Sequence, residues 1–343
     1  MKTISERFSW RTYAVFVLIL ASAMLLCICV GSVSIPLGDT LTAIWNTLWG
    51  LEVPQGISKN IILNVRLPRV INVALVGAAL SLCGAAMQGL LRNPLADGST
   101  LGVSSGASLG AVLALALGIT IPGTSMGGVM LLAMLFAFLS LVLILSLAYV
   151  LDRSLSTNSI ILIGVIVSMF ASSLINLLIS FASDQVRSIT FWTMGSMSGT
   201  GFDHTRILML ALLICGGVIL RYARELNAFA IGEENARHIG VNVKRVKLMI
   251  LVTVSVLIGV CVSISGTIGF VGLVVPHMAR MVAGPNHKRL LPSSLFSGAV
   301  FLLLADLAAR TLLRPIELSI GVVTSLVGAV AFVMIFYRTR KAV

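Results

Sequence analysis

Residues 127–151 read GGVMLLAMLFAFLSLVLILSLAYVL, a run of 25 residues without one charged side chain. A transmembrane α-helix needs about 20 predominantly apolar residues. In hydrocarbon the backbone of such a segment satisfies its own polar groups as a helix. This stretch therefore predicts one helix that crosses a lipid bilayer.

Nine further apolar stretches repeat the pattern, each bounded by charges, proline or glycine clusters. We therefore predict an all-α polytopic membrane protein, one transmembrane domain over residues 1–343. The weakest spans are the sixth, whose apolar core is short, and the eighth, which Pro276 and His277 interrupt. The ten predicted transmembrane helices lie at about 13–33, 70–91, 101–121, 127–151, 159–181, 205–221, 247–265, 268–283, 290–309 and 318–337.

The composition excludes the common soluble classes. Hydrophobic residues make up 58% of the chain and charged residues 10%, and the mean hydropathy is +1.06. Soluble domains carry about a quarter charged residues. Collagen, coiled coil, disorder and a disulfide scaffold are excluded as well. The five cysteines lie in apolar segments without metal-type spacing, so we predict small buried hydrophobes and no metal site: Cys27, Cys29, Cys83, Cys215 and Cys261.

The positive charge is distributed as in a membrane protein. The net charge is +12, which in a soluble protein would suggest nucleic-acid binding. With the N-terminus inside, seventeen Lys and Arg residues fall on the inner side of the predicted spans and seven on the outer side. Cytoplasmic loops carry this excess, so we predict two cytoplasmic termini and no nucleic-acid partner. The apolar run Tyr13–Val33 is too long for a signal peptide and is predicted to stay as the first span.

Glycines gather on particular faces of the predicted spans. Gly102, Gly106 and Gly110 recur every four residues among serines and alanines, and the second span carries Gly77, Gly84 and Gly89. Small residues let helix backbones approach closely in membranes. We expect these faces to pack against other helices.

Motifs for catalysis are missing from the sequence. It has no phosphate-binding loop, zinc-binding helix or nucleophile elbow, so we predict that the chain is not an enzyme by itself. Asp306 is the one acidic residue deep inside a span, and Arg310 follows four residues later, which predicts an intramembrane pair. An ion-coupled secondary transporter needs more titratable groups at depth, and an intramembrane enzyme needs paired catalytic groups. The energy for any transport would come from another subunit.

The longest polar segment is predicted to be cytoplasmic and lies at about 222–246. Residues 227–239 have helical spacing and stop at Gly240. A short helix there, carrying Glu233, Glu234, Arg237 and His238, is suited to dock on a soluble partner. The alternative is a solvated loop that joins two spans.

Several motifs in a fixed order resemble one family. The sequence is similar to the permease subunits of the ten-helix, type II ABC importers for iron–siderophore complexes, cobalamin and haem, the FecCD-like permeases. The resemblance runs from about Arg66 to the last span. The motifs are RLPR at 66–69, GAALSLCGAAMQGLLRNPLADGSTLGVSSGA at 77–107, LST at 155–157, AIGEENARHIG at 230–240, GTIGFVGLVVPH at 266–277, ADLAAR at 305–310 and IELSIGVVT at 316–324.

The resemblance implies roles at the cytoplasmic side. The stretch 230–240 matches the coupling helix that fits a groove in the ATPase subunit, and Gly232 would allow its tight start. Its candidate residues are Ala230, Gly232, Glu233, Glu234, Ala236, Arg237 and Gly240. Asn93, Leu95, Ser156 and Thr157 match the cytoplasmic gate, although hydroxyls before an apolar run are also common helix caps.

It also implies roles elsewhere. Arg66, Arg69 and Arg310 match arginines that receive acidic residues of a substrate-binding protein; the alternative is snorkelling at the membrane interface. Small polar residues at helical spacing on the fifth span are candidates for the translocation wall, or else for interhelical hydrogen bonds. They are Ser168, Ser172, Asn176 and Ser180.

The resemblance thus predicts the permease of a binding-protein-dependent ABC importer in the bacterial cytoplasmic membrane. It implies a homodimer, two ATPase subunits that bind ATP and Mg, an extracytoplasmic binding protein and alternating access, with no cofactor in this chain. The expected substrate is an iron–siderophore complex, and cobalamin or haem are the alternatives. Pairing with a paralogous permease and an ion-coupled transporter stay open as alternatives.

Overall fold

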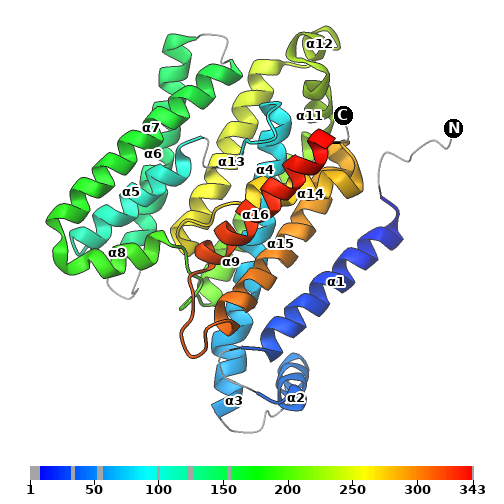
Figure 1. Cartoon of the computed structure of the whole chain (residues 1–343). Helices are drawn as coiled ribbons and strands as arrows, with labels where there is room; N and C mark the ends of the chain where they lie inside the picture. The colour runs from blue at the N-terminus through cyan, green and yellow to red at the C-terminus, as the bar shows by residue number, and fades with distance from the viewer. Residues whose placement is uncertain are drawn as a thin grey trace.

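The computed structural model describes residues 8–31, 35–51, 57–98, 101–121, 127–152 and 156–341. Every regular element in these ranges is a helix (Figure 1). The long elements are α1 Trp10–Cys29, α4 Leu67–Leu90, α5 Val103–Ala116, α6 Gly127–Leu151, α7 Thr157–Phe181, α9 Phe202–Ala211, α13 Val243–Ser265, α14 Val271–Ala283, α15 His287–Thr311 and α16 Ile320–Lys341. The short ones are α2 Leu37–Leu48, α3 Ile57–Asn60, η1 Ile61–Arg66, η2 Ser183–Gln185, α8 Val186–Thr193, η3 Leu212–Gly216, α10 Gly217–Arg221, α11 Ala223–Ile231 and α12 Glu233–His238.

Each predicted span is occupied by a helix, which confirms the all-α polytopic membrane fold. Seven helical stretches in the described residues are long and apolar enough to cross a membrane. In the other three predicted spans the apolar helical stretch is shorter; these stretches are α5, α14 and the part Ile320–Met334 of α16. With about 1.5 Å of rise per residue, the 13 residues of α14 are shorter than the hydrocarbon thickness of about 30 Å.

The two weakest predicted spans turn out to be continuous helices. The sixth runs without a break from Phe202 to Arg221, because α9, η3 and α10 follow one another directly. The eighth, α14, continues through Pro276, so the expected interruption there is wrong. The irregular residue is instead Phe270, whose φ of +67° ends the preceding loop and starts the helix.

Helix α4 forms the centre of the bundle and is the most enclosed span. It packs against α15, α14 and α13, and α13 also packs against α5 and α6. In Figure 1, α5, α6, α7 and α8 therefore form one side of the molecule, and α1, α14, α15 and α16 the other. Most side chains of α4 are buried, whereas α1, α6 and α7 expose many large apolar ones.

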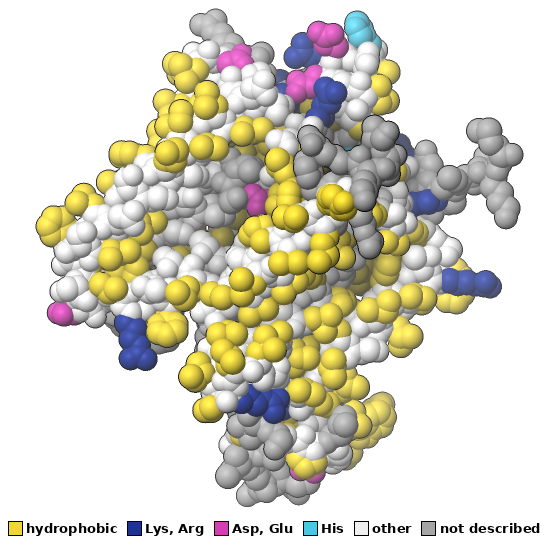
Figure 2. Space-filling view, in the orientation of Figure 1, with side chains coloured by type: hydrophobic (Ala, Val, Ile, Leu, Met, Phe, Trp, Pro, Cys, Tyr) yellow, Lys and Arg dark blue, Asp and Glu magenta, His cyan; other side chains and the backbone are white. Residues whose placement is uncertain are grey.

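The surface is consistent with a lipid environment around the middle of the molecule. Figure 2 shows apolar side chains across much of the visible face. The largest group of acidic and basic side chains lies at the end where α11 and α12 lie, and single ones are scattered elsewhere. Exposed apolar side chains in a contiguous band mark contact with lipid or with another helix. They include Phe138, Leu143, Met169 and Phe170.

The predicted glycine faces pack as expected. A Cβ on Gly77 of α4 would overlap the carbonyl oxygen of Gly298 on α15, and a Cβ on Gly298 would overlap that of Gly77. The two backbones are therefore in direct contact. Gly106 and Gly110 of α5 lie equally close to α6, at Ser140 and Leu132. The five cysteines are free and buried, as predicted.

Some predictions fall outside the described residues or miss an element. The predicted end of the first span at Val33, and Lys2, Arg7 and Arg153 of the predicted cytoplasmic charge, lie outside them. Helix α2 was not predicted. Trp45 of α2 and Trp49, directly after it, are exposed and 5.7 Å apart between ring centroids. Exposed tryptophans are typical of membrane–water interfaces.

Candidate functional site

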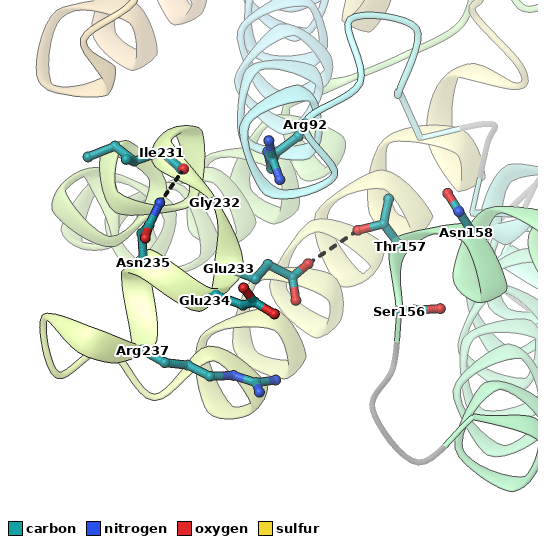
Figure 3. Close-up of a pocket in the computed structure, with 10 residues that line it drawn as sticks. All are labelled: Arg92, Ser156, Thr157, Asn158, Ile231, Gly232, Glu233, Glu234, Asn235 and Arg237. Carbon is teal, nitrogen blue, oxygen red and sulfur yellow. Dashed lines mark hydrogen bonds between the residues drawn. The ribbon is translucent and has the colours of Figure 1, made fainter.

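A cleft of about 500 Å³ opens between α12 and the start of α7. In Figure 3, Glu233 and Glu234 point from α12 toward the start of α7, and Arg92 from the turn after α4 lies beside them. The cleft thus combines three segments that are far apart in sequence. It is lined by Arg92, Ser156, Thr157, Asn158, Ile231, Gly232, Glu233, Glu234, Asn235 and Arg237.

The predicted helix over 227–239 is two helices. Helix α11 ends at Ile231 and α12 begins at Glu233, because Gly232 has a φ of +124° and a ψ of 150°. Backbone in this region is essentially restricted to glycine. Gly240, with a φ of +88°, ends the segment. The expected tight start and stop are confirmed, but the expectation of one continuous helix is wrong.

The two faces of α12 differ from the expectation. Glu234, Asn235 and Arg237 are exposed, as a docking surface requires. Ala236 is fully buried inside the chain itself, so it is not available to a partner. Glu233 also turns inward, where its carboxylate pairs with Lys247 of α13 at 2.6 Å.

Helix α11, which carries Ala230, is fixed to the bundle. Its Leu226 and Phe229 are fully buried, and α11 packs against α4 and α15. Asn227 accepts the backbone N–H of His287 at 2.8 Å and donates to the side-chain oxygen of Asn286 at 2.9 Å, both at the start of α15. Ala230 itself is exposed, close to the break at Gly232.

The helix-cap interpretation of the hydroxyls at the start of α7 is confirmed for Ser156, and the gate role stays a prediction. Ser156 caps α7, because its side chain accepts the backbone N–H of Ser159. The carboxylate of Asp152 accepts from Ser156 N and from Ser159 Oγ, each at 3.1 Å. Thr157 Oγ1 donates to Glu233 Oε1 at 3.5 Å. The start of α7 is therefore in contact with α12.

The other two predicted gate residues form a turn of their own. Asn93 Oδ1 accepts the backbone N–H of Leu95 at 2.9 Å, and Leu95 is half exposed. Neither lines the cleft; the residue of this turn that does is Arg92.

Three buried arginines, one buried acid and one partly exposed acid form a cluster where α4 begins and α15 ends, at the end of the bundle away from α12 (Figure 1). We call Arg66, Arg69, Arg310, Asp306 and Glu317 the arginine cluster. Arg69 donates to Asp306 Oδ1 and to Glu317 Oε2, both at 2.9 Å. Arg310 Nε lies 2.8 Å from Asp306 Oδ2, although their angles do not meet those of a hydrogen bond. The predicted pair of Asp306 and Arg310 is present, with Arg69 as an additional partner.

Docking on a binding protein would need these three arginines to face outward, but in this structure they turn inward. Arg66, Arg69 and Arg310 are 5%, 8% and 3% exposed. Arg66 donates to the carbonyl oxygens of Ile28 and Cys29, and Arg310 to those of Cys27 and Val30. The last carbonyls of a helix lack partners within it, so the two arginines turn inward to cap α1.

The candidate residues of the translocation wall separate into two groups. Ser172 and Asn176 are exposed on α7, where lipid, a second copy or a pathway could lie against them. Ser168 faces α5 instead, since its Oγ is buried and a Cβ on Gly102 would lie 3.2 Å from it. Its expected place on the wall is not supported, because the close approach of α5 covers it.

Three residues at these sites were not predicted individually. Lys247 was counted as cytoplasmic charge, yet it is fully buried; its position at the very start of an apolar run was the available signal. Glu317 lies in the IELS motif at 316–319, and Arg92 lies next to the predicted gate residue Asn93.

The fold and the cleft define a polytopic helical membrane protein of the kind that forms the transmembrane part of a transporter. The chain belongs to the FecCD transport family, which matches residues 18–338, so the resemblance read from the motifs is confirmed. It is a multi-pass protein of the bacterial inner membrane.

Its relatives are permease subunits of ABC transporters. It is 43% identical over 335 residues to the ABC transporter permease protein YvrB of Bacillus subtilis, covering 96% of this chain and 95% of that one. It is 36% identical over 307 residues to the hemin transport system permease protein HmuU of Yersinia pestis, covering 88% and 90%. Further relatives are permeases for iron(3+)-hydroxamate, vitamin B12 and molybdate.

A solved structure has the same fold. It is described as an inward-facing conformation of a metal-chelate type ABC transporter; it is 31% identical, has a TM-score of 0.82 and covers 96% of this chain and 99% of its own. The chain is thus an ABC importer permease of the FecCD family. Such permeases are transport components that work with ATPase and substrate-binding partners.

Proposed function

We propose that this permease imports an iron–siderophore complex as a homodimer with two ATPase subunits, which bind ATP and Mg, and an extracytoplasmic binding protein. The observation that carries the proposal is the exposed face of α12 beside the cleft, because it offers a surface for an ATPase next to the start of α7. Alternating access then follows when movement of α12 switches the cytoplasmic gate between its open and closed states. The gate is formed near Ser156, Thr157, Asn93 and Leu95.

The names of several relatives support a chelated metal as cargo. Hemin and iron(3+)-hydroxamate are both metal chelates, and the hydroxamate permease relative covers 99% of this chain. Haem and cobalamin are the competing cargoes. Because one relative is a molybdate permease, an oxyanion is a further candidate cargo.

The test is uptake by proteoliposomes that contain the permease with its ATPase and binding protein. A ferric hydroxamate siderophore, haemin, cobalamin and molybdate are offered in turn, with ATP inside. ATP-dependent uptake of the siderophore alone is the expected result. Uptake of another cargo would correct the substrate, and uptake driven by an ion gradient without the ATPase would overturn the whole proposal.

The docking face has its own test. Reversing the charges of the exposed side chains, Glu234→Lys with Arg237→Glu, should prevent co-purification of the ATPase while the permease keeps its melting temperature. Rim charges act mainly on association. Normal co-purification would remove α12 as the coupling helix.

A further inference from the structure

Lys247 lies within the second turn of α13 and is fully buried, side chain included. A buried charge is costly unless a counter-charge accompanies it. Glu233 supplies one at 2.6 Å from α12. Because breaking such a pair is unfavourable, α12 is tied to α13 more firmly than its length of six residues suggests.

The same carboxylate oxygen makes a second and weaker contact. Thr157 Oγ1, at the start of α7, donates to Glu233 Oε1 at 3.5 Å, the long limit for a hydrogen bond (Figure 3). Glu233 therefore holds α13 through a short ion pair and α7 through a long hydrogen bond. Of the two contacts, the one to α7 is the easier to break.

A hinge separates this unit from the helix before it. Helix α11 is held on α4 and α15 by the buried Leu226 and Phe229 and by the hydrogen bonds of Asn227. Between α11 and Glu233 there is only Gly232, with its φ of +124°. Across this break, Asn235 Nδ2 of α12 donates to the carbonyl oxygen of Ile231 at 3.0 Å (Figure 3). Helix α12 therefore stays next to the end of α11, while its ion pair connects it to α13.

We propose that Glu233 is the positioning residue that links α12 to the gate. Its carboxylate stays paired with Lys247 in every state of the transport cycle, so α12 and α13 move as one body about Gly232. Its contact with Thr157 is made in one state and lost in the other, and this couples the position of α12 to the start of α7. The inference rests on the proposed role of α12 as the ATPase contact.

The first test removes only the contact with α7. Thr157→Val keeps the shape of the side chain and deletes the hydroxyl. Transport per ATP hydrolysed should fall about twofold to fivefold, as for the loss of one weak hydrogen bond, and Thr157→Ser should restore it. The matched control is Thr190→Val, whose hydroxyl bonds within α8 and which should leave transport per ATP unchanged.

The second test concerns the ion pair. Glu233→Gln should lower the yield of assembled complex, because Lys247 loses the carboxylate beside it. The apolar pair Glu233→Leu with Lys247→Met should restore assembly and the melting temperature but not transport per ATP. The double variant separates a positioning role of Glu233 from a role in stability. If the ion pair only stabilised the protein, apolar packing in its place would restore transport per ATP as well.

Each outcome has a defined meaning. Normal transport per ATP in the apolar double variant, or in Thr157→Val, would overturn the role of Glu233. A parallel loss of melting temperature and of transport in Thr157→Val would also overturn it, since that is the signature of a structural contact. If the unmodified complex itself shows no ATP-driven uptake, the proposed function fails instead.

Discussion

The two ends of the bundle hold their buried charges in different ways. In the arginine cluster, Asp306 is fully buried between Arg69 and Arg310, and Arg66 and Arg310 also bond to the end of α1. At the α12 end, Glu233 joins the buried Lys247 to a hydroxyl beside an open cleft. One end ties three long helices together from inside, and the other holds a short helix next to a hinge.

This difference indicates which part of the molecule is rigid and which part can move. Buried ion pairs with several partners are expensive to separate, so α1, α4 and α15 form a rigid body. The short helix α12 lies between two glycines of positive φ. It is paired with α13 through Lys247 but meets the start of α7 through one long hydrogen bond, so its position relative to α7 is the easier one to change. We therefore expect changes at the first end to affect stability and changes at the second to affect coupling.

The largest effect is expected from Asp306→Asn. It removes the negative charge between two buried arginines, and breaking such a buried set costs about 3–5 kcal/mol. The melting temperature of the purified permease in detergent should fall sharply. Asp203→Asn is the control, because the pair of Asp203 with Arg206 is exposed and should be dispensable. Equal melting temperatures for the two variants would show that the cluster is not a rigid tie.

Gly77→Leu tests the same rigid body by adding a large side chain between α4 and α15. Its side chain would have to enter the contact with the Gly298 backbone, and overpacking of this kind costs about 1–3 kcal/mol. The control is Gly217→Leu, because no atom lies within 4 Å of a Cβ at Gly217. Thermal unfolding of both variants is the measurement. A Gly77→Leu protein as stable as the control would mean that α4 and α15 can separate freely.

Gly232→Ala tests the hinge by conformation. A Cβ there has room, since the nearest atom, Nδ2 of Asn235, is 3.6 Å away, but the backbone angles suit glycine only. The strain of about 1–3 kcal/mol falls on α12 at the edge of the molecule. ATPase co-purification and uptake should drop while the melting temperature changes little. Gly38→Ala serves as the control, because Gly38 has open space around it and no positive φ. The hinge assignment is wrong if the two variants show the same ATPase co-purification and the same uptake.

The smallest effect is expected from Glu317→Gln. Glu317 is the partly exposed partner of Arg69, so a docking carboxylate of a binding protein would have to compete with it. Ion pairs with one exposed member contribute about 0–1 kcal/mol. Affinity for the binding protein should therefore rise by no more than about fivefold, and less at high salt. Asp203→Asn is again the control, because it also removes one negative charge but lies away from Arg69. If Glu317→Gln binds the binding protein more weakly than the unmodified permease does, the result argues against docking at Arg69.

The fold could be predicted from the sequence because its signal is local. A run such as 127–151 contains within itself the length and the hydropathy that make it a membrane helix. The close contacts of Gly77 and Gly106 were predictable for the same reason, since small residues at a helical spacing show which face can approach a neighbour. The spacing over 227–239 predicted one continuous helix, because the apolar pattern continues across Gly232 and the backbone angle of a glycine has no signature in that pattern. Only the family resemblance pointed to a tight start at Gly232.

The arginines show what the sequence could not decide. An arginine near a helix end can snorkel, dock or turn inward, and the outcome depends on which acceptors the fold brings to it. For Arg69 that acceptor is Asp306, 237 positions away. Lys247 poses the same problem, because its burial depends on α12 folding back over it. The docking, gate and coupling roles therefore stay predictions.

The capping of α1 also has a consequence for the order of events during synthesis. The carbonyl of Val30 is bonded by Arg310, 280 positions later in the chain. A ribosome adds about 5–20 residues per second, so roughly 14–56 s pass between the emergence of these two partners. During this interval the first helix resides in the membrane with an unfinished end, and its final placement is fixed only when the ninth span arrives.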